Sequence, residues 1–321
     1  MTFDDRAIDW LADLLADAAR AEIMPRFRRL GEGDVRQKTS AADLVTEADV
    51  NAERLITARL RERYASAMIV GEEACSDNPA LLGGLGDAEL AFVIDPVDGT
   101  FNFASGVPLF GVMLGVVVEG ETVAGIIHDP VGKDWLIGAK GAGSHIRHAH
   151  GALEKVRVAE PVPISEMTGA VSWQYLKEPE RSRLARNQTK ALSQFGYRCA
   201  AHEYRLLANG HAHFVVYNKL MPWDHLAGVL IHQEARRPRR PHRRRSLSAV
   251  ACRWRAARSA GQEQLGRAAA RTLGGVDRPS LRQTGGLCGW NRRPRSAIRI
   301  ISRAATETPQ KPAANGVTVP L

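Results

Sequence analysis

The stretch "FVIDPVDGTFNF", Phe92 to Phe103, joins an apolar run directly to two carboxylates that are three residues apart. The apolar residues predict a buried strand, so Asp95 at its end is expected to lie partly out of water. Two neighbouring acids in such a place repel one another unless a cation lies between them. The stretch therefore predicts a metal site, with a simple helix cap at Asp98 as the alternative.

A second short apolar run, Met68 to Val70, delivers acids in the same way. It ends at Gly71 and is followed directly by Glu72 and Glu73. Ligands usually bind beyond the carboxyl ends of the strands in a sheet that helices cover. We therefore expect these acids and those of the first stretch to share one crevice. Because they offer only oxygen, Mg²⁺ fits better than Zn²⁺.

A Gly-Thr pair follows the second aspartate. Gly99 has no side chain, so the backbone can approach a ligand closely, and the N–H groups of Gly99 and Thr100 at a helix start favour an anion. Carboxylates for metal beside amides for phosphate indicate phosphoryl-transfer chemistry.

The rest of residues 1–235 predicts alternating helices, strands and hairpins. Helices are expected over residues 4–30, from the cap Thr46 to about Arg63, and from Asp224 onward, and a hairpin turn at Glu119-Gly120. A strand is expected from Phe214 to Tyr217. The pattern is typical of layered sheets and helices.

Composition bounds the class of protein. The chain has 321 residues, of which 44% are hydrophobic, enough for one large or two moderate domains with a core. Acids stand where a secretory leader would be basic, and no apolar run is long enough to span a membrane, so we expect a cytoplasmic protein. The four cysteines are scattered, which favours buried or incidental thiols.

Charge divides the chain in two. Residues 1–235 hold 24 Lys/Arg and 32 Asp/Glu, a net charge of −8, whereas residues 236–321 hold 20 and 3, a net charge of +17. We therefore expect a boundary at residue 235. The basic segment fits a nucleic-acid-binding arm or an irregular, solvated extension.

Three motifs, "GEEA", "IDPVDGTFNF" and "PWDHLAGVLIHQEA", follow one another at separations that resemble the inositol monophosphatase family of Mg²⁺-dependent phosphatases. That family also includes histidinol-phosphate, bisphosphate-nucleotide and fructose-bisphosphate phosphatases. The resemblance covers about residues 5–235. It implies an α/β (α+β) fold, a layered αβαβα sandwich of the inositol monophosphatase and fructose-bisphosphatase type.

The resemblance also implies roles for single residues. Two or three Mg²⁺ ions would be held by Glu72, Asp95, the Val97 carbonyl, Asp98 and Asp224. Catalytic roles in orienting the attacking water fall to Glu72, Thr100 and Asp49. The phosphate would bind the amides of Gly99 and Thr100. The implied reaction is hydrolysis of a small phosphorylated alcohol of the inositol monophosphate type by metal-activated water, without a phospho-enzyme intermediate.

The substrate side departs from the family pattern. Tyr217 stands where inositol-specific members carry a glutamate, and Arg198 stands where many members carry a glycine. Histidinol phosphate and a nucleotide or sugar bisphosphate therefore remain alternative substrates. Glu203, Arg205 and Tyr217 are candidate substrate contacts, with surface or packing roles as the alternative.

The segment after Ala235 has a further interpretation. The family continues Glu-Ala-Gly-Gly, and glycine codons read one base out of register give the Arg-Arg-Pro found here, so residues 236–321 are interpreted as a shifted reading frame. An altered C-terminus would weaken the support of Asp224 and impair activity. The resemblance implies a homodimer. An inactive protein that binds nucleic acid non-specifically through the basic tail is the alternative from another class.

Overall fold

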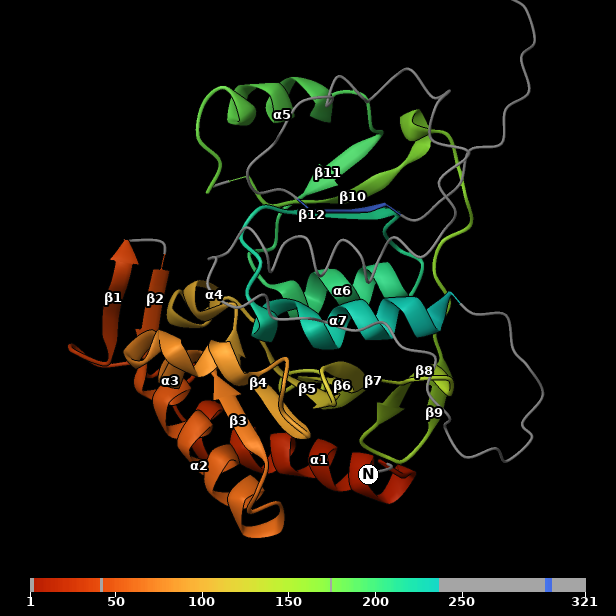
Figure 1. Cartoon of the computed structure of the whole chain (residues 1–321). Coiled ribbons are helices and arrows are strands. Elements are labelled where there is room, and N and C mark those ends of the chain that lie inside the picture. The colour runs from red at the N-terminus through yellow and green to blue at the C-terminus, as the bar shows by residue number, and fades with distance from the viewer. Residues whose placement is uncertain (1–2, 41–42, 174, 237–297, 302–321) are drawn as a thin grey trace, which may run out of the picture.

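The computed structural model describes residues 3–40, 43–173, 175–236 and 298–301. Their helices and sheets form five layers, in the order helices, sheet, helices, sheet, helix (Figure 1). The layered αβαβα sandwich expected from the sequence is confirmed.

The first layer holds two helices and covers one face of a large mixed sheet. Helix α1 (Asp5–Ala18) continues into the short π-helix η1 (Ala19–Ile23), and α2 (Glu47–Arg63) lies beside them. The sheet has seven strands in the order β3 (Met68–Gly71), β4 (Leu90–Asp98), β5 (Gly111–Val118), β6 (Glu121–Asp129), β7 (Asp134–Ala139), β8 (Gly143–His148) and β9 (Leu153–Lys155). Strands β3 and β4 are parallel, so their carboxyl ends meet at one edge; the other pairs are antiparallel.

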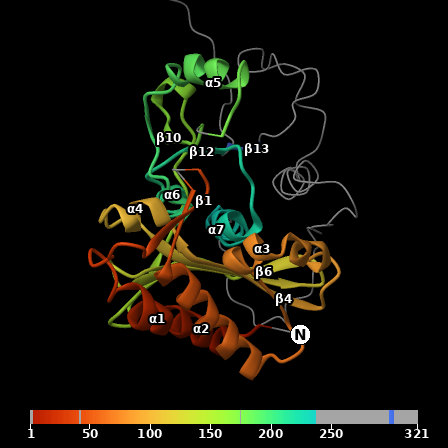
Figure 2. The ribbon, with the colours of Figure 1, turned by 90° about the vertical axis from the view of Figure 1, so that its left-hand side faces the viewer.

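The other face of this sheet carries α6 (Ala200–Ala208) and α7 (Pro222–Ala235), which separate it from a second sheet (Figure 2). The second sheet has the order β11 (Ser193–Phe195), β10 (Thr168–Val171), β12 (Phe214–Tyr217) and β13 (Ile298–Ile301). Helix α5 (Glu180–Gln188) forms the outer layer. The remaining elements are the hairpin β1 (Val35–Ser40) and β2 (Asp43–Thr46), the short helices α3 (Glu72–Asp77) and α4 (Thr100–Ala104), and the 3₁₀ turns η2 (Pro79–Gly84) and η3 (Ile164–Glu166).

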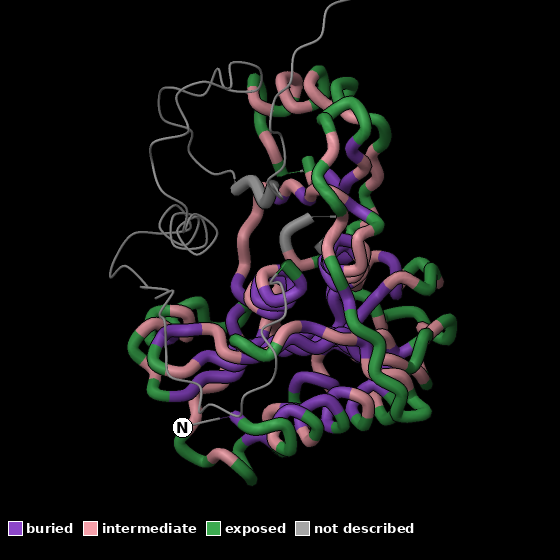
Figure 3. The backbone as a smooth tube through the Cα atoms, turned by 90° about the vertical axis from the view of Figure 1, so that its right-hand side faces the viewer, coloured by how far each residue is buried: buried purple, intermediate pink, exposed green. Residues whose placement is uncertain are grey.

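The central strands of the large sheet are buried on both faces, whereas its edge strand β9 is exposed (Figure 3). Leu15 and Ile56 pack with Phe92 on one side, and Met113 packs with Tyr204 on the other. A Cβ atom at Gly125 would lie 2.6 Å from the carbonyl oxygen of Ala227, so glycine permits α7 to lie directly against β6. This close approach fixes the helix that carries Asp224.

Several local expectations are confirmed. Thr46 caps α2, and its backbone N–H donates to Asp49 in a capping box, so the helix begins at Glu47 and ends at Arg63 as expected. The turn at Glu119-Gly120 joins antiparallel β5 and β6. In the basic segment, β13 pairs antiparallel with β12, which differs from an irregular tail at those four residues. The three interpretations of the segment otherwise concern residues outside those described, and they stay predictions.

Two expectations from composition can be compared with the described residues. Cys75 and Cys199 are free and buried, while Cys252 and Cys288 lie outside those ranges. None of the helices in the described ranges is long and apolar enough to cross a membrane.

A buried histidine on α7 gives a testable prediction for stability. His232 is 1% exposed, neither ring nitrogen has a hydrogen-bond partner among the described residues, and burial lowers its pKa from 6.5 to about 4. The folded chain therefore holds this proton less tightly than the unfolded chain, so stability is lost as pH falls from 6.5 towards 4. His232→Leu removes the two ring nitrogens that lack hydrogen-bond partners among the described residues, and with them the loss of stability at low pH.

We expect His232→Leu to raise the melting temperature by about 4 °C at pH 5 and by less at pH 8. Thermal unfolding at the two pH values measures this, and the other buried histidines cancel because both proteins contain them. An equal difference at both pH values would contradict the assignment.

Candidate active site

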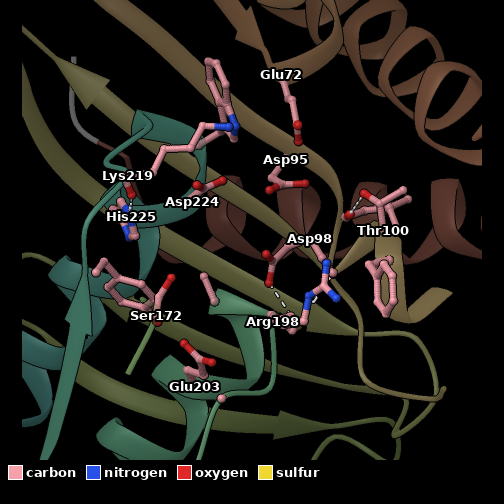
Figure 4. Close-up of a pocket in the computed structure, with 18 of the residues that line it drawn as sticks. Glu72, Asp95, Asp98, Thr100, Ser172, Arg198, Glu203, Lys219, Asp224 and His225 are labelled. Carbon is pink, nitrogen blue, oxygen red and sulfur yellow. Dashed lines mark hydrogen bonds between the residues drawn. The ribbon is translucent and has the colours of Figure 1, made fainter. Parts of the chain in front are cut away.

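The carboxyl ends of β3 and β4 deliver the predicted acids to one pocket, which Asp224 reaches from α7 (Figure 4). Glu72 is the first residue of α3, directly after β3. In β4, the pairing with β5 shifts by one residue between Asp95 and Asp98, and this bulge accompanies the change from strand to pocket wall. The acidic side chains that line the pocket are Glu72, Asp95, Asp98, Glu203 and Asp224.

Asp95 is the most constrained of these acids. Its side chain is 2% exposed, and its Oδ1 atom has no hydrogen-bond partner among the described residues. Burial raises its pKa well above 3.8, and the charges of Glu72, Asp98 and Asp224 raise it further. A buried carboxylate surrounded by other carboxylates requires a neutralising cation or a proton.

Asp98 is anchored from the layer of helices above. Its Oδ2 atom accepts the backbone N–H of Ala201 at 2.6 Å and the thiol of Cys199 at 3.0 Å. Burial raises its pKa, and these hydrogen bonds act in the opposite direction. The start of α6 therefore holds Asp98 in a fixed orientation towards the pocket.

Asp224 is brought in by α7, where it lies in the first turn after Pro222. Desolvation raises its pKa well above 3.8, and Glu72 and Asp98 add to this rise. Its carboxyl group lies against that of Asp95. Residues far apart in the sequence thus place their negative charges together.

Thr100 connects the pocket to a buried carboxylate behind its wall. Its hydroxyl lies 3.0 Å from Asp49 Oδ1 and 3.0 Å from the Val97 carbonyl oxygen, either of which can accept its single proton. Asp49 is fully buried, and burial is the main cause that raises its pKa to about 6. Asp49 therefore acts on the pocket through Thr100.

Gly99 makes the turn between β4 and α4. Its φ of 88° lies in the left-handed region, where a side chain is strained. A Cβ atom there would lie 2.9 Å from the Leu109 carbonyl oxygen and 3.1 Å from Cys199 Cβ. Glycine is therefore required by both backbone and packing.

Lys38 is a contact that sequence reasoning missed. It extends from β1, and its ammonium group lies 3.0 Å from Glu72 and 2.7 Å from Glu73. Burial works against its charge, but these two glutamates raise its pKa above the ordinary value of 10.5. The Lys38 ammonium group thus balances negative charge at the Glu72 edge of the acidic pocket.

The candidate substrate residues divide into two groups. Glu203 and Tyr217 line the pocket, whereas Arg205 does not, and its guanidinium pairs with Asp134 at 2.7 Å. Arg198 and Lys219, which were not among the candidates, do line it. The departure of Arg198 from the glycine pattern was the sequence signal for the first of these.

The donor set fits Mg²⁺. Every acidic group that lines the pocket offers oxygen, and Asp95 Oδ1, for which the described residues provide no hydrogen-bond partner, is an available ligand atom. Among the described residues, no three His, Cys, Asp or Glu side chains already converge on one point as a complete set of ligands. Mg²⁺ keeps several waters and shares its coordination shell with phosphate, so an open set of carboxylates suits it.

Glu53 supports this set from α2. Its two carboxylate oxygens accept the backbone N–H groups of Glu73 and Ala74, each at 2.8 Å, at the start of α3. The carboxylate fills the space beside Gly71, where a Cβ atom would lie 2.2 Å from it. Glu53 therefore positions Glu72 at the pocket edge.

We expect Glu53→Gln to weaken Mg²⁺ binding about tenfold, the effect typical of an outer group that orients a ligand. Glutamine has nearly the size of glutamate, but its NH₂ group would face one of the two backbone N–H groups that Glu53 accepts, so one hydrogen bond is lost. Calorimetric titration of the folded variant with Mg²⁺ measures the effect. Glu62→Gln is the matched control, since Glu62 lies on the same helix with its side chain 69% exposed. A lower melting temperature with unchanged Mg²⁺ affinity would show a structural role only.

Comparison with known proteins gives consistent results. A sequence profile of the inositol monophosphatase family matches residues 6–236. An inositol-1-monophosphatase of Mycobacterium bovis is 32% identical over 233 residues, which cover 70% of this chain and 79% of the relative. A fructose-1,6-bisphosphatase/inositol-1-monophosphatase of Thermotoga maritima is 29% identical over 208 residues, 63% of this chain and 73% of the relative. The solved structure of an IMPase from Thermotoga maritima matches with a TM-score of 0.61 and 28% identity, over 72% of this chain and 84% of that one.

Proposed function

The chain belongs to the inositol monophosphatase family, and from this we propose that it is a Mg²⁺-dependent phosphomonoesterase acting on a small phosphorylated alcohol. One observation carries the proposal: Asp95 is buried among Glu72, Asp98 and Asp224, its Oδ1 atom has no hydrogen-bond partner in the described part of the chain, and the Gly99 turn, without a side-chain cap, lies in the same pocket. Such a cluster fits cations and an anionic substrate together.

We assign two or three Mg²⁺ ions to Glu72, Asp95, the Val97 carbonyl, Asp98 and Asp224. When bound, the ions supply positive charge for the phosphoryl oxygens and lower the pKa of water. The four carboxylates would hold the ions, and Glu53 and Lys38 fix the position of Glu72.

The remaining groups orient the reactants. The Thr100 hydroxyl, donating to Asp49, presents its oxygen lone pairs to an attacking water. Asp49 remains mostly ionised above its pKa of about 6 and keeps the hydroxyl in this direction. The amides of Gly99 and Thr100 bind the phosphate at the start of α4, and Glu203 and Tyr217 lie on the side of the pocket left for the alcohol.

The same proposal covers the whole chain. The described residues that line the pocket fall between Leu44 and His225, which supports our proposal that residues 1–235 form the phosphatase domain. As the family resemblance implies, we propose a homodimer that acts in the cytoplasm. Sedimentation of the purified chain tests the oligomeric state.

Phosphate release from a panel of esters tests the function. Full-length chain is assayed with Mg²⁺ on inositol monophosphate, histidinol phosphate and adenosine bisphosphate, beside Asp98→Asn and the exposed control Asp77→Asn. We expect release that Asp98→Asn alone abolishes, and the preferred ester identifies the alcohol. Release that persists in Asp98→Asn would refute the proposed site.

A further inference from the structure

The turn before α6 holds an arginine in an unfavourable backbone conformation. Arg198 has a φ of 55°, in the left-handed region that favours glycine. Such a conformation is unfavourable for a residue that has a side chain. Strain kept at the edge of a pocket suggests that the side chain has a function there.

A buried carboxylate fixes this turn. Glu203 is 3% exposed, and its Oε1 atom accepts the backbone N–H of Tyr197 at 2.9 Å. The backbone N–H of Arg198 also favours its charged form. Glu203 therefore fixes the backbone position from which the Arg198 side chain extends.

The guanidinium of Arg198 lies beside the phosphate-binding turn. Its central carbon is 3.5 Å from the centroid of the Phe101 ring, and Phe101 directly follows Thr100. Arg198 lines the pocket, and Figure 4 shows its side chain near Asp98. A guanidinium stacked on a ring keeps its N–H groups in its own plane, where they can bind a carboxylate or phosphate in a bidentate manner.

A second cation lies on the strand side of the pocket. Lys219 follows β12, and its ammonium nitrogen is 5.3 Å from the centroid of the Tyr175 ring. Of the described residues that line the pocket, Arg198 is the only arginine and Lys219 the only lysine. Nearby, the buried Tyr217 hydroxyl lies against the Glu203 carboxylate and favours its charged form. The pocket thus offers two positive charges outside the cluster of metal-binding carboxylates.

Resting on the proposed function, we propose that Arg198, assisted by Lys219, binds a second anionic group carried by the leaving alcohol. This group is a carboxylate or a second phosphate. The phosphate that is cleaved binds instead at the Gly99 turn and the carboxylate-held ions. Arg198 is therefore a specificity-determining residue of this chain, and esters of uncharged alcohols are poorer substrates.

The test compares matched esters on the full-length chain with Mg²⁺. Glycerol 2-phosphate is paired with 2-phosphoglycerate, which adds a carboxylate, and fructose 6-phosphate with fructose 1,6-bisphosphate, which adds a phosphate. We expect kcat/KM to be about tenfold higher for the ester with the second anion in at least one pair. Arg198→Gln should remove that preference, chiefly by raising KM for the ester with the second anion. For the ester without it, kcat/KM should change by no more than about twofold.

Two further variants complete the test. Arg198→Lys should restore part of the preference, and Arg186→Gln, at an exposed arginine on α5, should leave it unchanged. If Arg198→Gln lowers kcat/KM equally for both esters of each pair, Arg198 contacts the cleaved phosphate, and the proposal is overturned. Unchanged kcat/KM for all esters would overturn it as well. Calorimetric binding of the same pairs with Ca²⁺ separates the two claims. If no ester is hydrolysed, an Arg198-dependent preference in binding supports this inference while the phosphatase proposal fails, and its absence overturns both.

Discussion

Asp95→Asn is expected to lower phosphate release about a thousandfold and, in the same protein, to raise the melting temperature of the metal-free chain by about 5 °C. Activity falls because the central carboxylate for the metal ions is lost. Stability rises because the neutral asparagine replaces a carboxylate whose charge is unfavourable in this place. Burial is the main cause that raises the pKa of Asp95, and the charges of Glu72, Asp98 and Asp224 raise it further. A raised pKa in an acid means that stability is lost as pH rises above 3.8, so the gain from asparagine should be larger at pH 7.5 than at pH 4.

Thermal unfolding in a chelator and phosphate release with Mg²⁺ measure the two effects. Asp87→Asn, at an exposed acid, is the control and should change neither. Added Mg²⁺ should stabilise the wild-type chain but not Asp95→Asn. Unchanged stability in the chelator together with retained activity would contradict the placement of Asp95 at the centre of the site.

Thr100→Val is expected to lower kcat about a hundredfold with little change in KM, whereas Thr100→Ser should retain most activity. Valine has nearly the shape of threonine but lacks the hydroxyl that lies 3.0 Å from Asp49. Serine keeps this hydroxyl. The loss should therefore follow the hydrogen bond and not the methyl group.

Steady-state kinetics on the preferred ester measure this difference, with melting temperatures to show that all three proteins fold. Removing the acceptor, in Asp49→Asn, should add little to the loss in Thr100→Val, because the two groups act together. Equal activity of Thr100→Val and Thr100→Ser would show that the hydroxyl does not orient the water.

The acidic half of the site was predictable because strand ends and acids are adjacent in the sequence. The apolar runs before Glu72 and Asp95 predicted buried strands, and β3 and β4 are parallel neighbours, so their ends meet. The capping box at Thr46 and Asp49 was equally local. Asp224 was placed with them by its Trp-Asp motif, since no local pattern indicates which helix reaches the pocket.

The supporting contacts depend on long-range packing and were not predictable. Lys38 meets Glu72 from a hairpin, and Glu53 meets the start of α3 from the middle of α2. Arg205 shows the opposite case. It lies two residues after Glu203 on α6, and residues so spaced project about 200° apart around a helix, so both cannot face one pocket.

A Mg²⁺-dependent phosphatase activity in the acidic pocket can be measured as phosphate release by chelator-treated, full-length chain while Mg²⁺ is added back, on the ester that the panel selects. We predict no release without metal and a saturable rise with Mg²⁺ that is absent from Asp95→Asn. Release that is equal with and without Mg²⁺, or a folded chain that binds Mg²⁺ and releases no phosphate from any ester, would contradict it.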